Sequence, residues 1–223
     1  MQNEIAHQIF INIGRGELRD IPAFNWSHEK TKVFCQKNDI KHILWSEKDI
    51  LDLLEDYPEY KDLYHGFRYD IQRIDFARLL ILYHHGGLYI DLDIQPFEGS
   101  NIKYIFEKEF FIARWNKSHL PYNAIIGCQK RSPLMLKCLE EVERSYEEKS
   151  QMEIYHKWKA RFVFQTTGHY AIHRVLKKVV EYSPVVSVYN SLKNICECCP
   201  KGQALFMDGS ASVWYNEEFK GTD

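Results

Sequence analysis

The sequence lacks the features that mark membrane, nucleic-acid-binding and secreted proteins. No apolar run approaches the roughly 20 residues of a membrane-spanning helix, so no membrane span is expected. Lys and Arg total 29 against 31 Asp and Glu, a net charge of -2. This balance excludes the basic surface typical of a nucleic-acid partner. The opening residues, MQNEIAHQIF, contain no basic segment followed by an apolar one, so they predict no signal peptide. We therefore expect a soluble, cytoplasmic chain.

Cysteine is scarce, and its spacing is irregular. No CxxC pair recurs at the spacing of a zinc finger. Reduced thiols of an intracellular protein are the favoured interpretation, ahead of disulfides or a zinc cluster in the CECCP segment. Thiolates are soft ligands, so we leave them out of a site for a hard cation. The six cysteines are Cys35, Cys128, Cys138, Cys196, Cys198 and Cys199.

The chain does have enough apolar and aromatic side chains, 45% and 14%, for a substantial core. Its 223 residues show no repeat, linker or low-complexity block, and we expect residues 1–223 to form a single domain. Strand patterns cover 5–13, 40–45, 88–94, 109–115, 123–128, 184–189 and the start of 204–215. Helix patterns cover 27–37, 46–57, 68–85, 132–148 and 166–182. Such alternation is typical of an α/β fold with a mostly parallel central sheet flanked by helices.

The segment HHGGLYIDLDIQP, residues 84–96, places two carboxylates in apolar surroundings. The glycine pair 86–87 predicts the end of the preceding helix, because glycine tolerates the left-handed conformation after a helix. If the following residues are extended, Asp91 and Asp93 point to the same face. In open α/β sheets, ligands collect beyond the carboxyl ends of strands. The pair therefore predicts a site for Mn²⁺ or Mg²⁺, which would neutralise charge on a diphosphate leaving group.

These residues closely resemble a family signature. RIDFARLLILYHHGGLYIDLD contains an Asp, an Arg three residues later, a leucine-rich helix, a glycine pair, an aromatic residue and D-x-D. That order resembles the DXD-containing sugar transferases of glycosyltransferase family 32. These are relatives of the yeast outer-chain mannosyltransferases and bacterial capsule enzymes and, more distantly, of the clostridial glucosylating toxins. The matching residues are Asp75, Arg78, Gly86, Gly87, Tyr89, Asp91 and Asp93.

The resemblance implies a GT-A fold, which is a Rossmann-like nucleotide-binding fold. It also implies a metal-dependent, retaining transfer of a hexose from a nucleotide sugar, with UDP as the favoured nucleotide. The metal would be Mn²⁺ or Mg²⁺. The acceptor would be a glycan, a protein or a lipid-linked saccharide.

The resemblance assigns roles to the residues around the D-x-D motif. Asp91 and Asp93 would hold the metal. Asp75 and Arg78 would bind the donor sugar or phosphate, with a plain intrahelical ion pair as the alternative. Tyr89 would pack against the ribose, or would only fill the core.

Two segments near the chain ends also resemble the family. IAHQIF, residues 5–10, resembles its opening strand, with Phe10 in place of the usual Trp of the base pocket. MDGSASVWY resembles a late segment in which a His precedes Ser-Trp. Asp208 stands near that histidine and would be a further metal ligand. Ser212 and Trp214 would close over the diphosphate, with a surface loop as the alternative.

Two polar residues are candidates for the acceptor side of the site. Asn123 corresponds to a polar residue of the matching family strand, with a turn residue as the alternative. Gln165 is the second candidate. Thr167, in the same segment, is expected to cap the next helix rather than to bind a ligand.

The sequence leaves two other functions open. A phosphatase of the haloacid-dehalogenase type also ends a strand with D-x-D, but it needs the first Asp as nucleophile near the N-terminus. It also needs Thr or Val where this chain has Gln95. The second is a module that binds a nucleotide sugar without turnover. For a transferase, no separate Asp or Glu stands out as nucleophile. We therefore expect a front-face mechanism, in which the leaving phosphate accepts the acceptor's proton.

Overall fold

The computed structural model describes residues 4–14, 16–96, 102–114, 120–179, 186–190 and 206–208. Its helices are α1 (Pro22–Lys37), α2 (Glu47–Leu54), α3 (Lys61–Gly66), α4 (Asp70–His85), α5 (Lys103–Phe106), α6 (Pro133–Ser150), α7 (Ile154–Lys157), α8 (Lys159–Thr166) and α9 (His169–Val179). Its strands are β1 (Ile5–Ile9), β2 (Lys41–Trp45), β3 (Gly87–Ile90), β4 (Ile94–Pro96), β5 (Phe110–Arg114), β6 (Pro121–Cys128), β7 (Val186–Asn190) and β8 (Phe206–Asp208). Short 3-10 turns cover Leu18–Asp20 and Pro58–Tyr60.

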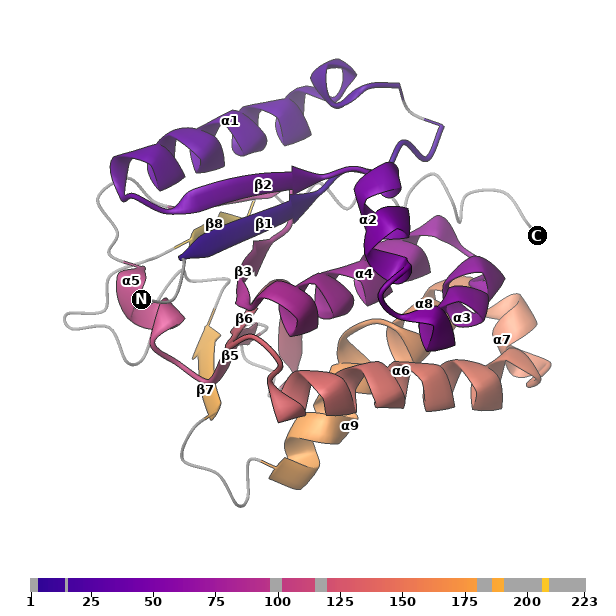
Figure 1. Cartoon of the computed structure of the whole chain (residues 1–223). Helices are drawn as coiled ribbons and strands as arrows, with labels where there is room; N and C mark the ends of the chain where they lie inside the picture. Colours follow the sequence, from indigo (N-terminus) through magenta and orange to yellow (C-terminus); the bar gives the residue numbers. More distant parts are fainter. Residues whose placement is uncertain are drawn as a thin grey trace.

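A mixed sheet forms the centre of the protein, with the strand order β2-β1-β3-β6-β5-β7 (Figure 1). Strand β1 pairs in parallel with β2 and β3, and β5 pairs in parallel with β7. Strand β6 is antiparallel to both of its neighbours, β3 and β5. Strands β4 and β8 form a separate antiparallel pair. The predicted α/β class with a central sheet is therefore confirmed.

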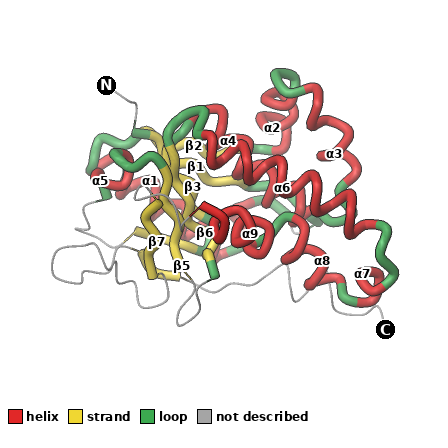
Figure 2. The backbone as a smooth tube through the Cα atoms, turned by 90° about the horizontal axis from the view of Figure 1, so that it is seen from below, coloured by secondary structure: helices red, strands yellow, loops and turns green. Residues whose placement is uncertain are grey.

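Helices cover both faces of this sheet (Figures 1 and 2). Helices α1 and α5 supply the core of one face, together with Ala6 and Leu88. Helices α2, α4, α6 and α9 supply the core of the other, together with Ile9 and Tyr89. Because successive side chains of a strand point to opposite faces, Leu88 faces α1 while Tyr89 faces α4. The candidate site is built on the α4 side.

Helix α4 is the element that positions the candidate site, and its residues are buried on almost every side. Apolar residues such as Leu79–Leu82 are buried, as expected for a helix in a core. One face of the helix is polar, yet its Gln72, Asp75 and Arg78 are buried as well. Buried polar groups need partners, so this face must meet other polar residues. The predicted helix end is confirmed at Gly86, which has a φ of 71°.

The first predicted strand and helix have different limits from those expected. Strand β1 ends at Ile9 rather than continuing to residue 13. Helix α1 begins at Pro22, so Ser27 lies inside the helix and does not cap it. By contrast, helix α2 begins near its predicted start, with a capping box in which Ser46 and Asp49 bond to each other's backbone N–H groups.

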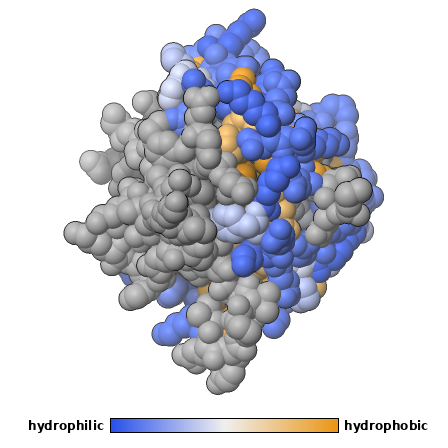
Figure 3. All heavy atoms as spheres, turned by 90° about the vertical axis from the view of Figure 1, so that its left-hand side faces the viewer, coloured by the Kyte–Doolittle hydropathy of each residue, from blue (hydrophilic) through white to orange (hydrophobic). Residues whose placement is uncertain are grey.

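The surface in Figure 3, which faces left in Figure 1, is largely hydrophilic over the described residues. Hydrophobic side chains reach it in small areas between the hydrophilic ones. Among the described helices, none combines the length and the apolar character needed to cross a bilayer.

Three of the six cysteines lie in the described part of the chain. Cys35, Cys128 and Cys138 are free and buried. Burial raises the pKa of Cys35 and of Cys138 to about 12, so both are unreactive thiols near neutral pH. The CECCP segment lies outside the described residues.

Candidate active site

The two aspartates of the D-x-D motif lie on a turn. Strand β3 ends at Ile90, and the N–H of Ile94 donates to the carbonyl of Asp91 at 3.0 Å, which closes the turn before β4. The expectation that strand alternation places Asp91 and Asp93 on one face is therefore wrong. Alternation requires extended backbone, and the extended backbone stops before the first aspartate.

Neighbouring elements hold this turn at both ends. The N–H of Asp91 donates to the carbonyl of Ala124 in β6 at 2.8 Å. At the other end, the hydroxyl of Ser27 donates to the carbonyl of Ile94 at 2.6 Å. Ser27 thus connects α1 to the turn, a role that its local sequence does not indicate. The carboxylates consequently project from a backbone fixed by β6 and α1.

The glycine pair is required by close packing before the turn. Gly87 has a φ of 96°, and a Cβ there would lie 2.4 Å from the carbonyl oxygen of Ile5 in β1. A Cβ on Gly86 would lie 2.5 Å from the backbone nitrogen of Lys130. Only glycine combines this backbone conformation with so little space. The pair therefore lets α4 end directly against the sheet.

His7 ties β1 to the same glycine pair. Its Nδ1 accepts from the indole N–H of Trp45 at 3.1 Å, so its Nε2 carries the proton and donates to the carbonyl of Gly86 at 2.9 Å. Burial lowers the pKa of His7 to about 3, which keeps the ring neutral in this role. Sequence reasoning missed His7. His7 stands in the segment IAHQIF, whose resemblance to the family's opening strand was a signal in the sequence, and the β1–β3 register pairs it with Tyr89.

Arg78 connects α4 to the D-x-D turn. Its Nη2 lies 3.1 Å from Oδ1 of Asp75 and 3.4 Å from Oδ1 of Asp91, and its Nη1 donates to the carbonyl of Asn123 at 2.8 Å. The guanidinium also lies over the ring of Tyr89, 4.8 Å from its centroid. Arg78 is only 3% exposed. Burial works to lower its pKa, but the neighbouring acidic groups outweigh that effect and raise it, so the side chain is charged.

Asp75 is buried among three hydrogen-bonding partners. Its Oδ1 accepts from Nδ2 of Asn123 at 3.1 Å and faces Arg78 at the same distance. Its Oδ2 accepts from the hydroxyl of Thr167 at 3.0 Å. Burial raises the pKa of Asp75 to about 6, against the opposing charge of Arg78, so the carboxylate is ionised at neutral pH. The intrahelical ion pair that the sequence offers as an alternative is present in the structure.

Thr167 therefore belongs to the site cluster, contrary to its expected role as a helix N-cap. It is the C-cap of α8, and its hydroxyl donates to Asp75. The two residues lie far apart in the sequence, so no local pattern could join them.

Tyr89 orients the first aspartate of the motif. Its hydroxyl donates to Oδ1 of Asp91 at 2.5 Å, and the residue is 1% exposed, so it also fills the core. Burial raises the pKa of Tyr89 well above its ordinary value, which keeps the phenol protonated as a donor. The Asp91 side chain is 27% exposed. Tyr89 and Arg78 both contact its Oδ1, so within the described residues its Oδ2 accepts no hydrogen bond.

The turn fits the ligand chemistry of a divalent cation. Carboxylate oxygens are the ligands that Mg²⁺ and Mn²⁺ prefer, and Asp91 and Asp93 supply them. Within the described residues, no three His, Cys, Asp or Glu side chains form a ready metal site. A cation here would therefore complete its coordination with water and diphosphate oxygens. The β4–β8 register places Asp208 opposite Ile94, the residue that follows Asp93, so Asp208 stays a candidate third ligand.

The structure brings together only some of the other predicted residues. Asn123, in β6, lies in the cluster with Asp75. Phe10 directly follows β1 and is half-buried. Gln165 lies in α8, where its side chain accepts from Arg174 at 3.1 Å, and no contact with the cluster is found in the described structure. Two predicted residues lie outside the described part of the chain: Ser212 and Trp214.

Comparisons with known proteins agree with this geometry. Residues 23–111 match the family described as "Glycosyltransferase sugar-binding region containing DXD motif". Mannosyl phosphorylinositol ceramide synthase SUR1 of Saccharomyces cerevisiae is 29% identical over 143 residues, or 63% of this chain. Inositol phosphoceramide mannosyltransferase 1 of Schizosaccharomyces pombe is 42% identical over 59 residues, or 26% of this chain. The aligned part spans only 34% of the length of the first relative and 18% of the second.

Solved structures show the fold. The glycosyltransferase PaToxG superposes with a TM-score of 0.53 and 16% identity, covering 80% of this chain and 70% of its own. A glycosyltransferase involved in the glycosylation of the major capsid of PBCV-1 superposes with a TM-score of 0.50 and 10% identity, covering 99% and 94%. This likeness means that the chain has the GT-A fold. Its residues 23–111 are similar to the sugar-binding region of DXD-containing glycosyltransferases.

Proposed function

We propose that this chain is a metal-dependent, retaining glycosyltransferase that moves a hexose from a nucleoside diphosphate sugar to a glycan or lipid-linked acceptor. The observation that carries the proposal is the connection between Arg78 and Asp91. A buried, permanently charged guanidinium lies 3.4 Å from the first aspartate of the D-x-D turn. It supplies fixed positive charge at the place where a diphosphate would approach, so it is suited to stabilise a departing diphosphate.

In this proposal, the aspartates of the D-x-D turn are metal ligands. Asp91 and Asp93 would hold a Mn²⁺ or Mg²⁺ ion, whose chemistry is to neutralise charge on the leaving diphosphate. Tyr89 and Arg78 hold Oδ1 of Asp91, and its Oδ2 would bind the ion. Asp208 would add a third carboxylate, supported by its register beside the turn. Oxygen ligation suits Mn²⁺ and Mg²⁺ equally, so both metals belong in the test.

Asp75 and Arg78 would bind the donor near its sugar. Both side chains are nearly buried, so the donor would meet only their exposed edges. Asn123 connects the two, because its side chain donates to Asp75 and its carbonyl accepts from Arg78. Asn123 is therefore suited to contact the acceptor while it holds Asp75 and Arg78, the two residues proposed to bind the donor.

The proposed transfer retains the anomeric configuration. The bond between the anomeric carbon and the diphosphate oxygen breaks, and the acceptor oxygen bonds to the same face of that carbon. The acceptor's proton passes to the departing phosphate oxygen. This route needs no carboxylate nucleophile. It is supported by the engagement of Asp75 with three partners, which removes that residue as a nucleophile.

The donor is tested with a panel of nucleotide sugars. The family resemblance favours UDP, whereas the two fungal relatives are named for mannosyl transfer. UDP-glucose, UDP-galactose and GDP-mannose cover both cases. We expect one of them to raise the melting temperature in the presence of Mn²⁺ and to release its nucleoside diphosphate. Tight binding with no release would instead identify a nucleotide-sugar-binding module.

Calorimetry with the matching nucleoside diphosphate tests the metal. We expect affinity to fall strongly after chelation, since the carboxylates repel a bare diphosphate. Equal affinity with and without Mn²⁺ would contradict metal dependence. Proton NMR of the product tests retention, and an inverted anomeric signal would refute the front-face route.

A further inference from the structure

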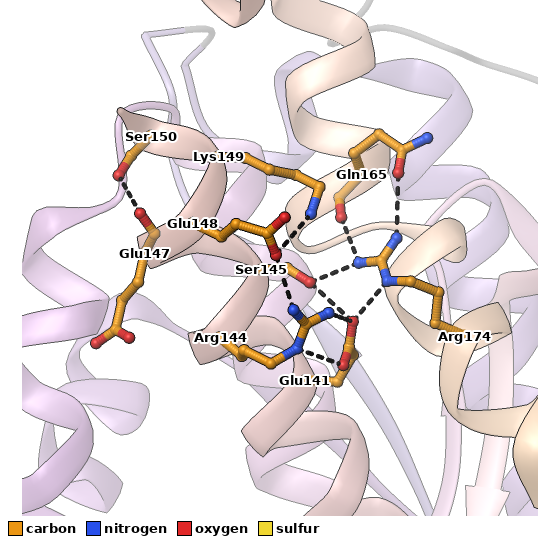
Figure 4. Close-up of polar contacts among 9 residues, drawn as sticks. All are labelled: Glu141, Arg144, Ser145, Glu147, Glu148, Lys149, Ser150, Gln165 and Arg174. Atoms are coloured by element: carbon orange, nitrogen blue, oxygen red, sulfur yellow. Dashed lines mark hydrogen bonds and ion pairs between the residues drawn. The ribbon is translucent and has the colours of Figure 1, made fainter. Parts of the chain in front are cut away.

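A polar network joins α6, α8 and α9 around Glu141 (Figure 4). Oε1 of Glu141 accepts from Nη2 of Arg144 at 2.8 Å, from Nε of Arg174 at 2.5 Å and from the hydroxyl of Ser145 at 2.9 Å. Burial works to raise the pKa of Glu141, but these hydrogen bonds outweigh it and lower the pKa to about 2. Glu141 is therefore a fixed negative anchor for two arginines.

Arg174 uses its remaining donors on the end of α8 and on Ser145 of α6, whose hydroxyl oxygen accepts from Nη2 at 2.5 Å. Its Nη2 donates to the backbone carbonyl of Gln165 at 2.7 Å, and its Nη1 donates to Oε1 of the same residue at 3.1 Å. Carbonyls in the last turn of a helix lack partners within the helix, and positive charge there is favourable. Figure 4 shows Arg174 reaching from α9 to both oxygens of Gln165. Arg174 thus holds the C-terminal end of α8 against Glu141.

The held end of α8 contacts the polar face of α4. Nε2 of Gln72 donates to the hydroxyl of Thr166 at 2.8 Å, and the hydroxyl of Thr167 donates to Oδ2 of Asp75 at 3.0 Å. Gln72 and Asp75 are neighbours on one face of α4. A continuous series of contacts therefore runs from the anchor on α6 to the carboxylate that faces Arg78.

We propose that Arg174 is a positioning residue for donor turnover, which acts by fixing α8 so that Thr167 holds Asp75 beside Arg78. This inference rests on the proposed transferase function and adds a residue that does not itself reach the D-x-D turn. No motif in the sequence marks Arg174. Its importance comes from its contacts with Gln165 at the C-terminal end of α8, close to Thr167.

Arg144 provides a matched control for Arg174. It donates to the same carboxylate, at 2.8 and 3.0 Å, and among the described residues its only other partner is Glu148 of the same helix. Arg144→Ala therefore removes one arginine from Glu141 without touching α8. Arg174→Ala removes the other arginine together with its contact to Ser145 and the two contacts to Gln165, and only the Gln165 contacts reach α8.

The test compares Arg174→Ala, Arg174→Lys, Thr167→Val, the double variant Arg174→Ala/Thr167→Val and Arg144→Ala. For each, kcat and KM for donor hydrolysis are measured below the melting temperature recorded by circular dichroism. We expect Arg174→Ala to lower kcat about 10-fold or more with little change in KM, since small misplacements of site groups are costly. Arg174→Lys should recover part of the loss, and Arg144→Ala should stay within about 2-fold, the size of an exposed ion pair.

The double variant tests whether Arg174 acts through Thr167. If it does, the double variant should be no slower than the slower single variant, because the two changes interrupt one connection. If the fold-loss of kcat in the double variant equals the product of the losses in the two single variants, the proposal is overturned. Equal kinetic losses in Arg174→Ala and Arg144→Ala would also overturn it, because they would reduce both to general stability.

Amide hydrogen exchange separates this inference from the proposed function. We expect faster exchange at the end of α8 in Arg174→Ala than in Arg144→Ala, whether or not a donor is turned over. A wild-type chain inactive with every donor, with this exchange difference intact, would refute the transferase and leave the contact series standing. An active wild type with unchanged Arg174→Ala kinetics would refute the positioning role alone.

Discussion

Replacing Tyr89 by phenylalanine removes one hydroxyl and little else. The ring would still lie under the guanidinium of Arg78, where the centroid distance is 4.8 Å, so core packing should be preserved. What disappears is the bond from the hydroxyl to Oδ1 of Asp91 at 2.5 Å. Because burial raises the pKa of Tyr89, the native phenol is always protonated, and the variant loses a permanent donor.

The size of the effect follows from the surroundings of Asp91. A hydrogen bond to a charged group contributes about 1.5–3 kcal/mol. Asp91 keeps Arg78 at 3.4 Å and its side chain is 27% exposed, so water can partly replace the hydroxyl. We therefore expect the lower figure, about 1.5 kcal/mol, which corresponds to about a 10-fold loss of kcat/KM if the bond acts in the transition state. The melting temperature should fall by about 3–6 °C.

Steady-state kinetics of donor hydrolysis with Mn²⁺, alongside thermal melting, measures both quantities. Tyr146→Phe is the matched control, because its hydroxyl also donates a hydrogen bond, to the carbonyl of Gly66, outside the site cluster. That variant should lose stability and keep its kcat/KM. Wild-type kcat/KM in Tyr89→Phe, or the same kinetic loss in both variants, would refute the role assigned to Tyr89.

Four further outcomes are expected. Asp93→Asn should abolish turnover while the melting temperature stays within about 2 °C, because the amide has the same shape as the carboxylate; a steep fall would instead indicate a structural carboxylate. Arg78→Lys keeps the charge but loses the planar fork, so kcat/KM should fall by more than 10-fold, roughly the loss of one charge-assisted bond; unchanged kinetics would leave only the ion-pair role. Gly87→Ala should prevent folding, since its Cβ would lie 2.4 Å from the carbonyl oxygen of Ile5, and a soluble, active variant would contradict the packing argument. Activity should fall as the pH drops through about 6, where Asp75 becomes protonated. Its folded pKa lies above the unfolded value of 3.8, so its ionised form destabilises the fold and protonation relieves that cost. The loss of activity at low pH should therefore occur without a fall in the melting temperature caused by Asp75.

Local patterns predicted the helix before the motif and its glycine stop. These are features that a single stretch of the chain decides. Residues 88–94 alternate like a strand, yet the turn at 91–93 forms because Ile94 bonds back to Asp91, and the register with β6 ends at Ile90 with one further bond from Asp91 to Ala124. That outcome depends on partners elsewhere in the chain. Periodicity carries no information about such partners.

The contacts that complete the site come from distant residues, which explains why they were missed. His7 reaches Gly86, Ser27 reaches Ile94, and Thr167 reaches Asp75. Each has an ordinary local interpretation as a strand residue or a helix cap. Only the fold reveals the partner, because the spacing along the chain has no fixed relation to distance in space.

The position of β1 has a consequence for anyone who shortens this chain. The family match begins at residue 23 and ends at 111, so it contains the D-x-D turn but excludes β1. Strand β1 lies between β2 and β3 and supplies the carbonyl against which Gly87 packs. In a fragment cut at those limits, β2 and β3 would lack the strand that lies between them, and Gly87 would lack the backbone of Ile5 against which it packs. The recognisable segment is therefore not a unit that can be transplanted, and the smallest working piece must include the opening strand.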